Sequence, residues 1–220
     1  MLRVFVVCTL LSATLSSLAG CPRLPEIQPP PAGPVPGPVS AAGWVAFEEN
    51  GVYGYRDQAG KVTVAPRFKM ALDAEGALAC AVDEGWVCLD GRGEVVLRPF
   101  VFDNGPDPFV EGRARHIEGD LHGFHDLQGT KVIPARFEFV TPFSEGRAAF
   151  CAGCKRVCEA EGSPCSYEGG KWGFIDLEGK QVIDATYDRV QPFADGRAQV
   201  TLQGAELWID LQGKPLPPQP

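Results

Sequence analysis

The fold is decided by residues 171–183, which read Lys-Trp-Gly-Phe-Ile-Asp-Leu-Glu-Gly-Lys-Gln-Val-Ile. Two short apolar segments, rich in aromatic and β-branched residues, flank the pair formed by Asp176 and Gly179. Such segments are typical of strands. Asp followed three residues later by Gly suits a tight turn, because the carboxylate accepts backbone N–H bonds and glycine tolerates a left-handed conformation. The stretch therefore predicts a β-hairpin.

The same turn recurs along the chain at steps of 33, 36, 50 and 34 residues. The pairs are Asp57 with Gly60, Asp90 with Gly93, Asp126 with Gly129, Asp176 with Gly179, and Asp210 with Gly213. A second motif, Pro-Phe-x-x-Gly-Arg-Ala, occupies residues 108–114, 142–148 and 192–198. A fixed spacing of this kind is the signature of a repeat protein. We interpret the five acids as structural, because every hairpin needs its turn whereas catalysis does not need five equivalent carboxylates.

This pattern, with Trp172 and Gly173 ahead of the turn, resembles the bacterial WG repeat family. The fit is close over residues 171–198, good over 121–148, looser over 52–79 and 86–114, and truncated at 207–216. Tyr-Gly and His-Gly replace Trp-Gly at residues 53 and 122, and Trp86 precedes Val87. The resemblance implies an all-β repeat fold. The family has no single established activity, so it implies little chemistry.

Each unit of about 35 residues offers three strands, and the expected fold is all-β, built from tandem hairpin repeats. The repeat region opens with a lone strand at residues 44–48 and ends with one at 207–210 and a stub at 214–216. Joining these ends completes a fifth unit, which favours a propeller-like ring of about five small units because closure removes exposed sheet edges. An open β-solenoid is the alternative.

Residues 1–20 have the pattern of an export signal, in which Arg3 precedes an apolar run too short to span a bilayer. The run ends at Leu-Ala-Gly-Cys, residues 18–21, which resembles the lipobox of bacterial lipoproteins. The resemblance implies cleavage before Cys21 and its acylation; ordinary secretion is the alternative. Pro22 is not the Asp that retains such lipoproteins in the inner membrane, so we expect the outer membrane in a Gram-negative host.

Residues 21–42 are expected to be the lipidated cysteine and a tether, because residues 22–41 hold eight prolines and no hydrophobic periodicity. Residues 43–220 are then the repeat domain. The chain carries 28 acidic against 20 basic residues, and such a surface repels phosphate backbones. We therefore expect no nucleic-acid partner, and membrane attachment through the acyl chains alone.

Six cysteines remain beside Cys8 and Cys21, an even number that favours disulfides in an exported protein. A three-residue turn after Val82 places Cys80 opposite Cys88, which predicts a cross-strand disulfide. An insertion at residues 151–170 holds the other four: Cys151, Cys154, Cys158 and Cys165. We expect two structural disulfides of unknown pairing there, in a stapled loop; Zn²⁺ binding by the four thiolates and a redox Cys-x-x-Cys are the alternatives. No other cofactor is expected.

Three arginines share one repeat position and form a candidate stripe for anionic ligands: Arg113, Arg147 and Arg197. Each follows an acid by two residues, so local pairing or solvation is the alternative. The four tryptophans are expected mainly in the core. His122 and His125 should point to opposite faces of one strand, which disfavours a shared metal.

No catalytic motif is recognisable, so no enzyme is expected. The sequence favours a non-enzymatic envelope lipoprotein that presents a β-repeat surface to a protein or glycan. Two alternatives remain open: a structural envelope protein without a specific ligand, and an enzymatic, metal-handling or thiol-handling protein built around the cysteine insertion.

Overall fold

The computed structural model describes residues 38–158 and 165–217, and this part of the chain is built from strands and turns without a helix. It therefore includes no helix of the length and apolarity needed to cross a membrane. The leader, Cys21 and most of the expected tether lie outside the described residues. The last residues of the expected tether, from 38 onward, are described and pack on the body. Ala41 is fully buried, and the backbone N–H of Val39 donates to Asp90 Oδ2 at 3.2 Å. The packed body thus begins earlier than residue 43.

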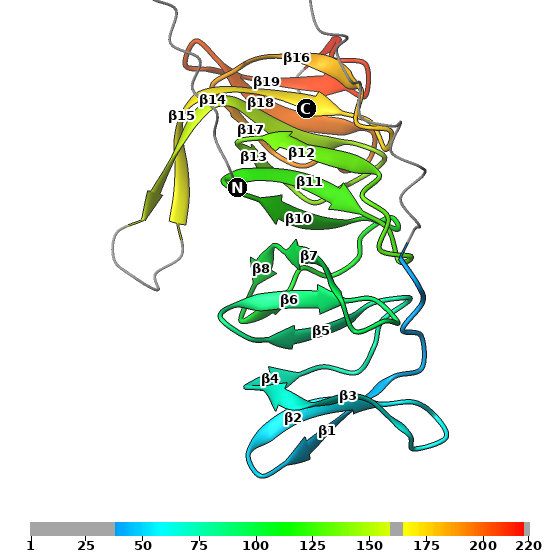
Figure 1. Cartoon of the computed structure of the whole chain (residues 1–220). Coiled ribbons are helices and arrows are strands. Elements are labelled where there is room, and N and C mark those ends of the chain that lie inside the picture. The colour runs from blue at the N-terminus through cyan, green and yellow to red at the C-terminus, as the bar shows by residue number, and fades with distance from the viewer. Residues whose placement is uncertain (1–37, 159–164, 218–220) are drawn as a thin grey trace, which may run out of the picture. The chain divides into compact units, whose positions relative to one another are not determined.

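The strands form five antiparallel meanders, numbered along the chain, of which the second and third are joined side by side in one seven-stranded sheet (Figure 1). Meander 1 comprises β1 (Val45–Glu49), β2 (Val52–Arg56) and β3 (Val62–Phe68). Meander 2 comprises β4 (Met70–Ala71), β5 (Ala79–Val82), β6 (Trp86–Leu89) and β7 (Val95–Pro99). After a small hairpin of β8 (Val101–Phe102) and β9 (Gly105–Pro106), meander 3 comprises β10 (Ala114–Glu118), β11 (Leu121–His125) and β12 (Ile133–Phe137). Meander 4 comprises β13 (Phe139–Val140), β14 (Ala148–Cys158), β15 (Cys165–Ile175) and β16 (Gln181–Tyr187). Meander 5 comprises β17 (Arg189–Val190), β18 (Arg197–Leu202), β19 (Ala205–Asp210) and β20 (Pro215–Leu216).

Three of the four connections between consecutive meanders are a single corner residue, such as Glu138 between β12 and β13 or Asp188 between β16 and β17. Residues 100–113, which include β8 and β9, connect meanders 2 and 3. The glycine of each Asp-x-x-Gly turn in meanders 2 to 5 packs against a side chain of the preceding meander. A Cβ placed on Gly179 would lie 2.9 Å from Ile133 Cγ2, and one on Gly129 would lie 2.7 Å from Leu78 Cδ2. Gly93 and Gly213 approach the preceding meander in the same way, at Val64 and Ile183. The meanders therefore stack in chain order.

The stack is open rather than ring-shaped. The expected ring required the two chain ends to share one unit, but β1 pairs with β2 and β18 pairs with β19, so each end completes its own meander. Figure 1 shows β1–β3 and β17–β20 at opposite ends of the series of sheets. The all-β repeat fold is confirmed, in its open form, because a terminal strand gains more by pairing locally than by closing a long loop.

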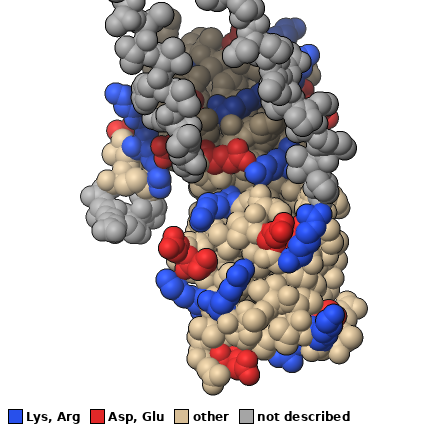
Figure 2. Space-filling model, in the orientation of Figure 1, with Lys and Arg blue, Asp and Glu red and all other residues tan. Residues whose placement is uncertain are grey.

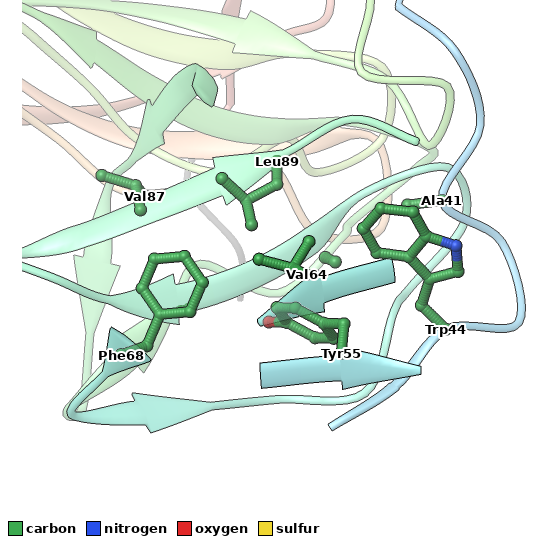
Figure 3. Packing of buried hydrophobic residues seen from close by; sticks show 9 residues of the cluster. Ala41, Trp44, Tyr55, Val64, Phe68, Val87 and Leu89 are labelled. Carbon is green, nitrogen blue, oxygen red and sulfur yellow. The ribbon is translucent and has the colours of Figure 1, made fainter. Parts of the chain in front are cut away.

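Aromatic residues fill the space between most neighbouring meanders. Between meanders 1 and 2, Tyr55 is fully buried against the edge of Phe68, with ring centroids 6.3 Å apart, and Leu89 closes the core from the other side (Figure 3). The hydroxyl of Tyr55 donates to the carbonyl of Cys80 at 2.7 Å, which ties the two meanders together. Similar apolar clusters lie between meanders 3 and 4 and between 4 and 5.

The glycine of the Trp-Gly position allows the strands to approach closely. A Cβ at Gly173 would overlap the carbonyl oxygen of Ile183 on β16, and one at Gly123 would overlap that of Ile133 on β12. The partner Trp172 is half-buried, with its ring 6.0 Å from that of Phe139. Among the tryptophans only Trp44 is buried; the other three are half-buried at the sides of the sheets.

Candidate functional site

The five repeated aspartates all act as turn residues: Asp57, Asp90, Asp126, Asp176 and Asp210. In each, Oδ1 accepts the backbone N–H groups two and four residues later, at 2.8–3.3 Å. One oxygen of each carboxylate thus holds its hairpin turn closed, which supports the structural interpretation of these acids.

The glycine three residues after each aspartate completes the turn. Its N–H donates to the carbonyl of that aspartate at 2.8–2.9 Å, and its φ lies between 77° and 81°. This left-handed conformation suits glycine, which lacks a Cβ. The five residues are Gly60, Gly93, Gly129, Gly179 and Gly213. They therefore have the structural role in the turn that the sequence predicted.

The acids beside the repeated arginines form a ladder between repeats. Glu111 Oε2 accepts the N–H of Gly146 at 2.9 Å, and Glu145 Oε2 accepts that of Gly196 at 2.8 Å. Glu111 and Glu145 therefore each accept a hydrogen bond from the equivalent turn of the following repeat. The local pairing with arginine that the sequence suggested is replaced by a bond between repeats. Arg147, at the middle of the arginine stripe, donates from Nε to the carbonyl of Leu211 at 3.1 Å.

Two of the three cysteine pairs join residues that face each other across a hairpin, and the third joins two residues of β14. Cys80 faces Cys88 across β5 and β6 with Cα atoms 4.0 Å apart, as predicted. In the insertion, Cys151 pairs with Cys154 and Cys158 with Cys165. Zinc binding would need all four sulfurs as thiolates, whereas the Cys151–Cys154 bond is the disulfide form of the Cys-x-x-Cys pair on which the redox alternative rests.

The insertion is a long hairpin arm, formed by residues 152–158 of β14 and 165–171 of β15. Its strands continue the ladder from Ala152↔Lys171 to Cys158↔Cys165 (Figure 1). The other meanders have turns of two or three residues at this place. Figure 1 shows the arm leaving the sheet and running beside the stack.

The arm is bent and braced near its root. The ladder is interrupted between Ala152 and Cys154, where Gly153 and Gly170 both have positive φ. Tyr167, further along the arm, stacks on Phe139 with centroids 4.2 Å apart, and its hydroxyl lies 3.3 Å from His122 Nε2. The bend thus lets one aromatic residue of the arm dock on the body.

A buried ion pair supports the surface on which Tyr167 docks. Arg115 binds Asp107 through two hydrogen bonds, Nη2 to Oδ1 at 2.7 Å and Nε to Oδ2 at 2.8 Å. Its guanidinium lies 3.9 Å from the ring centroid of Phe100 and donates to the carbonyl of Val140. Both charged side chains are less than 5% exposed, so each depends on the other for compensation.

The junction between meanders 2 and 3 differs from the other junctions. The residue two before each turn Asp is aromatic in four meanders but a cysteine in meander 2; the five are Tyr55, Cys88, Phe124, Phe174 and Trp208. In the next two junctions this aromatic meets the Phe of the following Pro-Phe motif, as in Phe124–Phe143 at 4.7 Å and Phe174–Phe193 at 4.8 Å. At the odd junction Phe109 instead packs against His125, at 5.3 Å.

Two buried histidines face this junction from meander 3. His116 is 0% exposed and His125 is 3% exposed, and their ring centroids lie 5.9 Å apart. Among the described residues, Nδ1 of neither ring has a hydrogen-bond partner. His122 points to the opposite face, toward Phe139, as the strand alternation predicted. Burial lowers the pKa of all three histidines from 6.5 to about 4. They are therefore neutral near pH 7.

A cavity of about 210 Å³ occupies the junction. Its lining is mainly apolar, with carboxylates and His125: Leu72, Asp73, Glu75, Leu78, Cys80, Cys88, Pro99, Pro106, Asp107, Pro108, Phe109 and His125. The repeat pattern alone did not indicate this site. The signals for it were a cysteine and histidines at repeat positions that hold large apolar residues elsewhere.

Neither the curated proteins nor the solved structures contain a match to this chain. The WG containing repeat family matches residues 123–153 and 172–204. Both segments run from the glycine or tryptophan of the Trp-Gly position, across a meander corner, into the strand after Pro-Phe-x-x-Gly. The family's unit therefore straddles two meanders, and this chain contains WG containing repeats at these two segments.

Proposed function

We propose that the chain is a non-enzymatic, lipid-anchored protein of the cell envelope whose repeat body presents the β14–β15 arm to another envelope protein. The observation that carries this proposal is the arm itself. Beyond Ala152 and Lys171, the described residues of its two strands pair only with each other. Apart from the N–H of Gly153, which donates to Glu138 Oε1 at 3.4 Å, the outer edge of β14 in the arm therefore offers backbone N–H and C=O groups.

An exposed strand edge is a template for an added strand, and extended peptide segments commonly bind in this way. The arm's side chains Lys155 and Arg156 are exposed on β14, and Val157 adds an apolar surface that is 38% exposed. Lys and Arg side chains are visible on the arm in Figure 2. These features suit an extended partner segment with acidic and apolar residues.

The arm's order before binding also supports a docking role. Two disulfides cross-link its described residues, and the Tyr167–Phe139 stack braces it against the body. Preorganisation reduces the entropy lost on association, so more of the contact energy remains as affinity. The body's role is then to hold the arm at a fixed place.

A photo-crosslinking residue at Val157 tests the docking role in intact cells. We expect a discrete protein adduct. The matched variant replaces residues 153–170 by Gln-Gly, the turn of β18–β19, with Cys151→Ala, and carries the crosslinker at Lys171. Adducts of the same partner with this variant, or capture of envelope glycan alone, would contradict arm-mediated protein binding.

The export and anchoring part of the proposal rests on the leader sequence and on three cysteine pairs suited to an oxidising compartment. Mass spectrometry of the protein from membranes should find an N-terminal acylated Cys21. A Cys21→Ser variant should appear with its leader uncleaved. Detection of a chain that starts elsewhere, or of an unmodified Cys21, would refute the lipid anchor.

A further inference from the structure

The cavity between meanders 2 and 3 exists because of one change in the repeat pattern. Cys88 stands where three neighbouring meanders place Phe or Tyr, and its disulfide to Cys80 is thinner than a ring. In meander 4 the equivalent cross-strand pair is Ala149↔Phe174, and Phe193 packs on that phenyl ring. The odd junction thus lacks about one aromatic ring of core.

The size and lining of the cavity suit a single ring. Cavities of about 150 Å³ lined by apolar residues bind benzene, and this cavity measures about 210 Å³. Its apolar walls include Leu78, Phe109 and the disulfide. A ring here would take the place that Phe174 fills beneath Phe193 between meanders 4 and 5.

The wall also contains a buried polar group that a ligand can satisfy. His125 is 3% exposed and is one of the residues that line the cavity, and its Nδ1 has no hydrogen-bond partner among the described residues. An unsatisfied buried polar atom destabilises the fold, so a ligand that supplies the missing hydrogen bond is favoured there. The later junctions avoid this cost, since the equivalent residue is Ile175 in meander 4 and Ile209 in meander 5.

The charge at the rim selects a cation. Asp73 and Glu75 are exposed and line the cavity, whereas the third carboxylate, Asp107, is neutralised by Arg115. Asp73 Oδ1 accepts one backbone N–H, from Ala46 at 2.9 Å. The two rim carboxylates therefore leave a net negative charge beside an apolar, ring-sized space.

We propose that this cavity binds a small organic amine with one ring. The ring lies between Phe109 and the Cys80–Cys88 disulfide, and the ammonium group lies at the carboxylates of Asp73 and Glu75. A polar substituent on the ligand bonds His125 Nδ1. This site is separate from the arm and does not depend on the arm's role.

Calorimetry with three matched probes tests the proposal on the purified chain. Benzylamine should bind with one-to-one stoichiometry. Benzyl alcohol, which keeps the ring and loses the charge, should bind about tenfold more weakly, and benzoate should not bind, since its charge is repelled.

Two variants assign the binding to the cavity. Cys80→Ala/Cys88→Phe copies the cross-strand pair of Ala149 and Phe174, fills the space and should abolish binding of both neutral and cationic probes. Asp73→Asn/Glu75→Gln should weaken benzylamine by about tenfold and leave benzyl alcohol unchanged. The control Asp83→Asn/Glu84→Gln removes two exposed acids from the neighbouring β5–β6 turn and should change neither.

Three results would overturn the proposal. These are no saturable binding of benzylamine at millimolar concentration, equal affinity for benzylamine and benzoate, or full binding by the cavity-filling variant. The rim variant guards against a folding failure of the double cysteine change, because it alters only exposed side chains.

Discussion

At the level of single residues, the turns of this fold are held by hydrogen bonds from backbone N–H groups to aspartate side chains. Asp176 is representative: its Oδ1 accepts the N–H groups of Glu178 and Lys180, and Gly179 supplies the left-handed position. A side chain that satisfies two backbone donors holds a hairpin closed without any help from distant segments. This locality is why the turn survives in all five repeats.

Replacing Asp176 by Ala should destabilise the protein by about 1–2 kcal/mol, because two backbone donors lose their acceptor. Asp176→Asn keeps a carbonyl acceptor and should cost less than half of that. Urea unfolding of the two variants beside the wild type measures the difference. Equal stabilities for Ala and Asn would show that the acceptor does not hold the turn.

Gly173→Ala should destabilise by about 2 kcal/mol or more, because the new methyl group would overlap the carbonyl oxygen of Ile183 and force two strands apart. Gly85→Ala is the matched control, since a Cβ there meets nothing within 4 Å and Gly85 does not have a positive φ. Thermal unfolding compares them. A control as unstable as Gly173→Ala would point to backbone entropy instead of close approach.

At the scale of elements, the arm differs from the hairpins around it in how its disulfides meet solvent. Cys158 is exposed near the end of the described ladder, whereas Cys88 is 1% exposed and Cys151 is fully buried. Thiol–disulfide exchange requires access of the attacking thiolate to a sulfur atom. The three bonds should therefore differ in reactivity while the protein remains folded.

Limited reduction followed by alkylation and peptide mass mapping should modify Cys158 and Cys165 first. Cys80 and Cys88 should react only as the body unfolds. Repeating the reaction in urea provides the control, since all three pairs should then react at similar rates. Early modification of Cys88 under native conditions would show that the junction opens far more readily than its burial indicates.

At the scale of the whole molecule, the open stack makes each meander depend on its neighbours. Its junctions are not equivalent, because meanders 2 and 3 meet through histidines, a cavity and a strand pair between β7 and β10. Meanders 3, 4 and 5 meet through phenyl rings. Acid should therefore act on the stack at this polar region first.

Stability should be constant above about pH 6.5 and fall as the pH drops toward 4. Burial holds the pKa of His116, His122 and His125 near 4 in the folded chain. Unfolded histidines titrate near 6.5, so the unfolded state binds more protons in this window and gains up to about 1.4 kcal/mol per pH unit for each histidine.

Urea midpoints from pH 8 to pH 5 measure this slope. The variant His116→Phe/His125→Ile places the residues of meander 4 at both positions and should remove about two thirds of the slope. Midpoints that stay flat in the wild type, or fall equally in the variant, would show that these histidines are not the groups that titrate.

Local features were predictable from the sequence because their causes lie within a few residues. The Asp-x-x-Gly turns, the strands around them and the Cys80↔Cys88 pairing all follow from alternation and turn length. The opposite faces of His122 and His125 follow from the same alternation. The pairing within the arm did not follow, because four nearby cysteines allow three connectivities. The register of the folded hairpin places Cys158 opposite Cys165, which leaves Cys151 to pair with Cys154.

Taken alone, the amino-acid order determined that this protein is a series of aromatic-rich hairpins, since hydrophobic period and turn chemistry act over short distances. Only the tertiary structure decided that the series stays open, that Glu111 and Glu145 cap the next repeat, and that Cys88 leaves a cavity beside His125. Each of these depends on which side chain of one repeat meets which side chain of the next. These contacts depend on how one meander is positioned against the next, which the sequence of a single repeat does not determine.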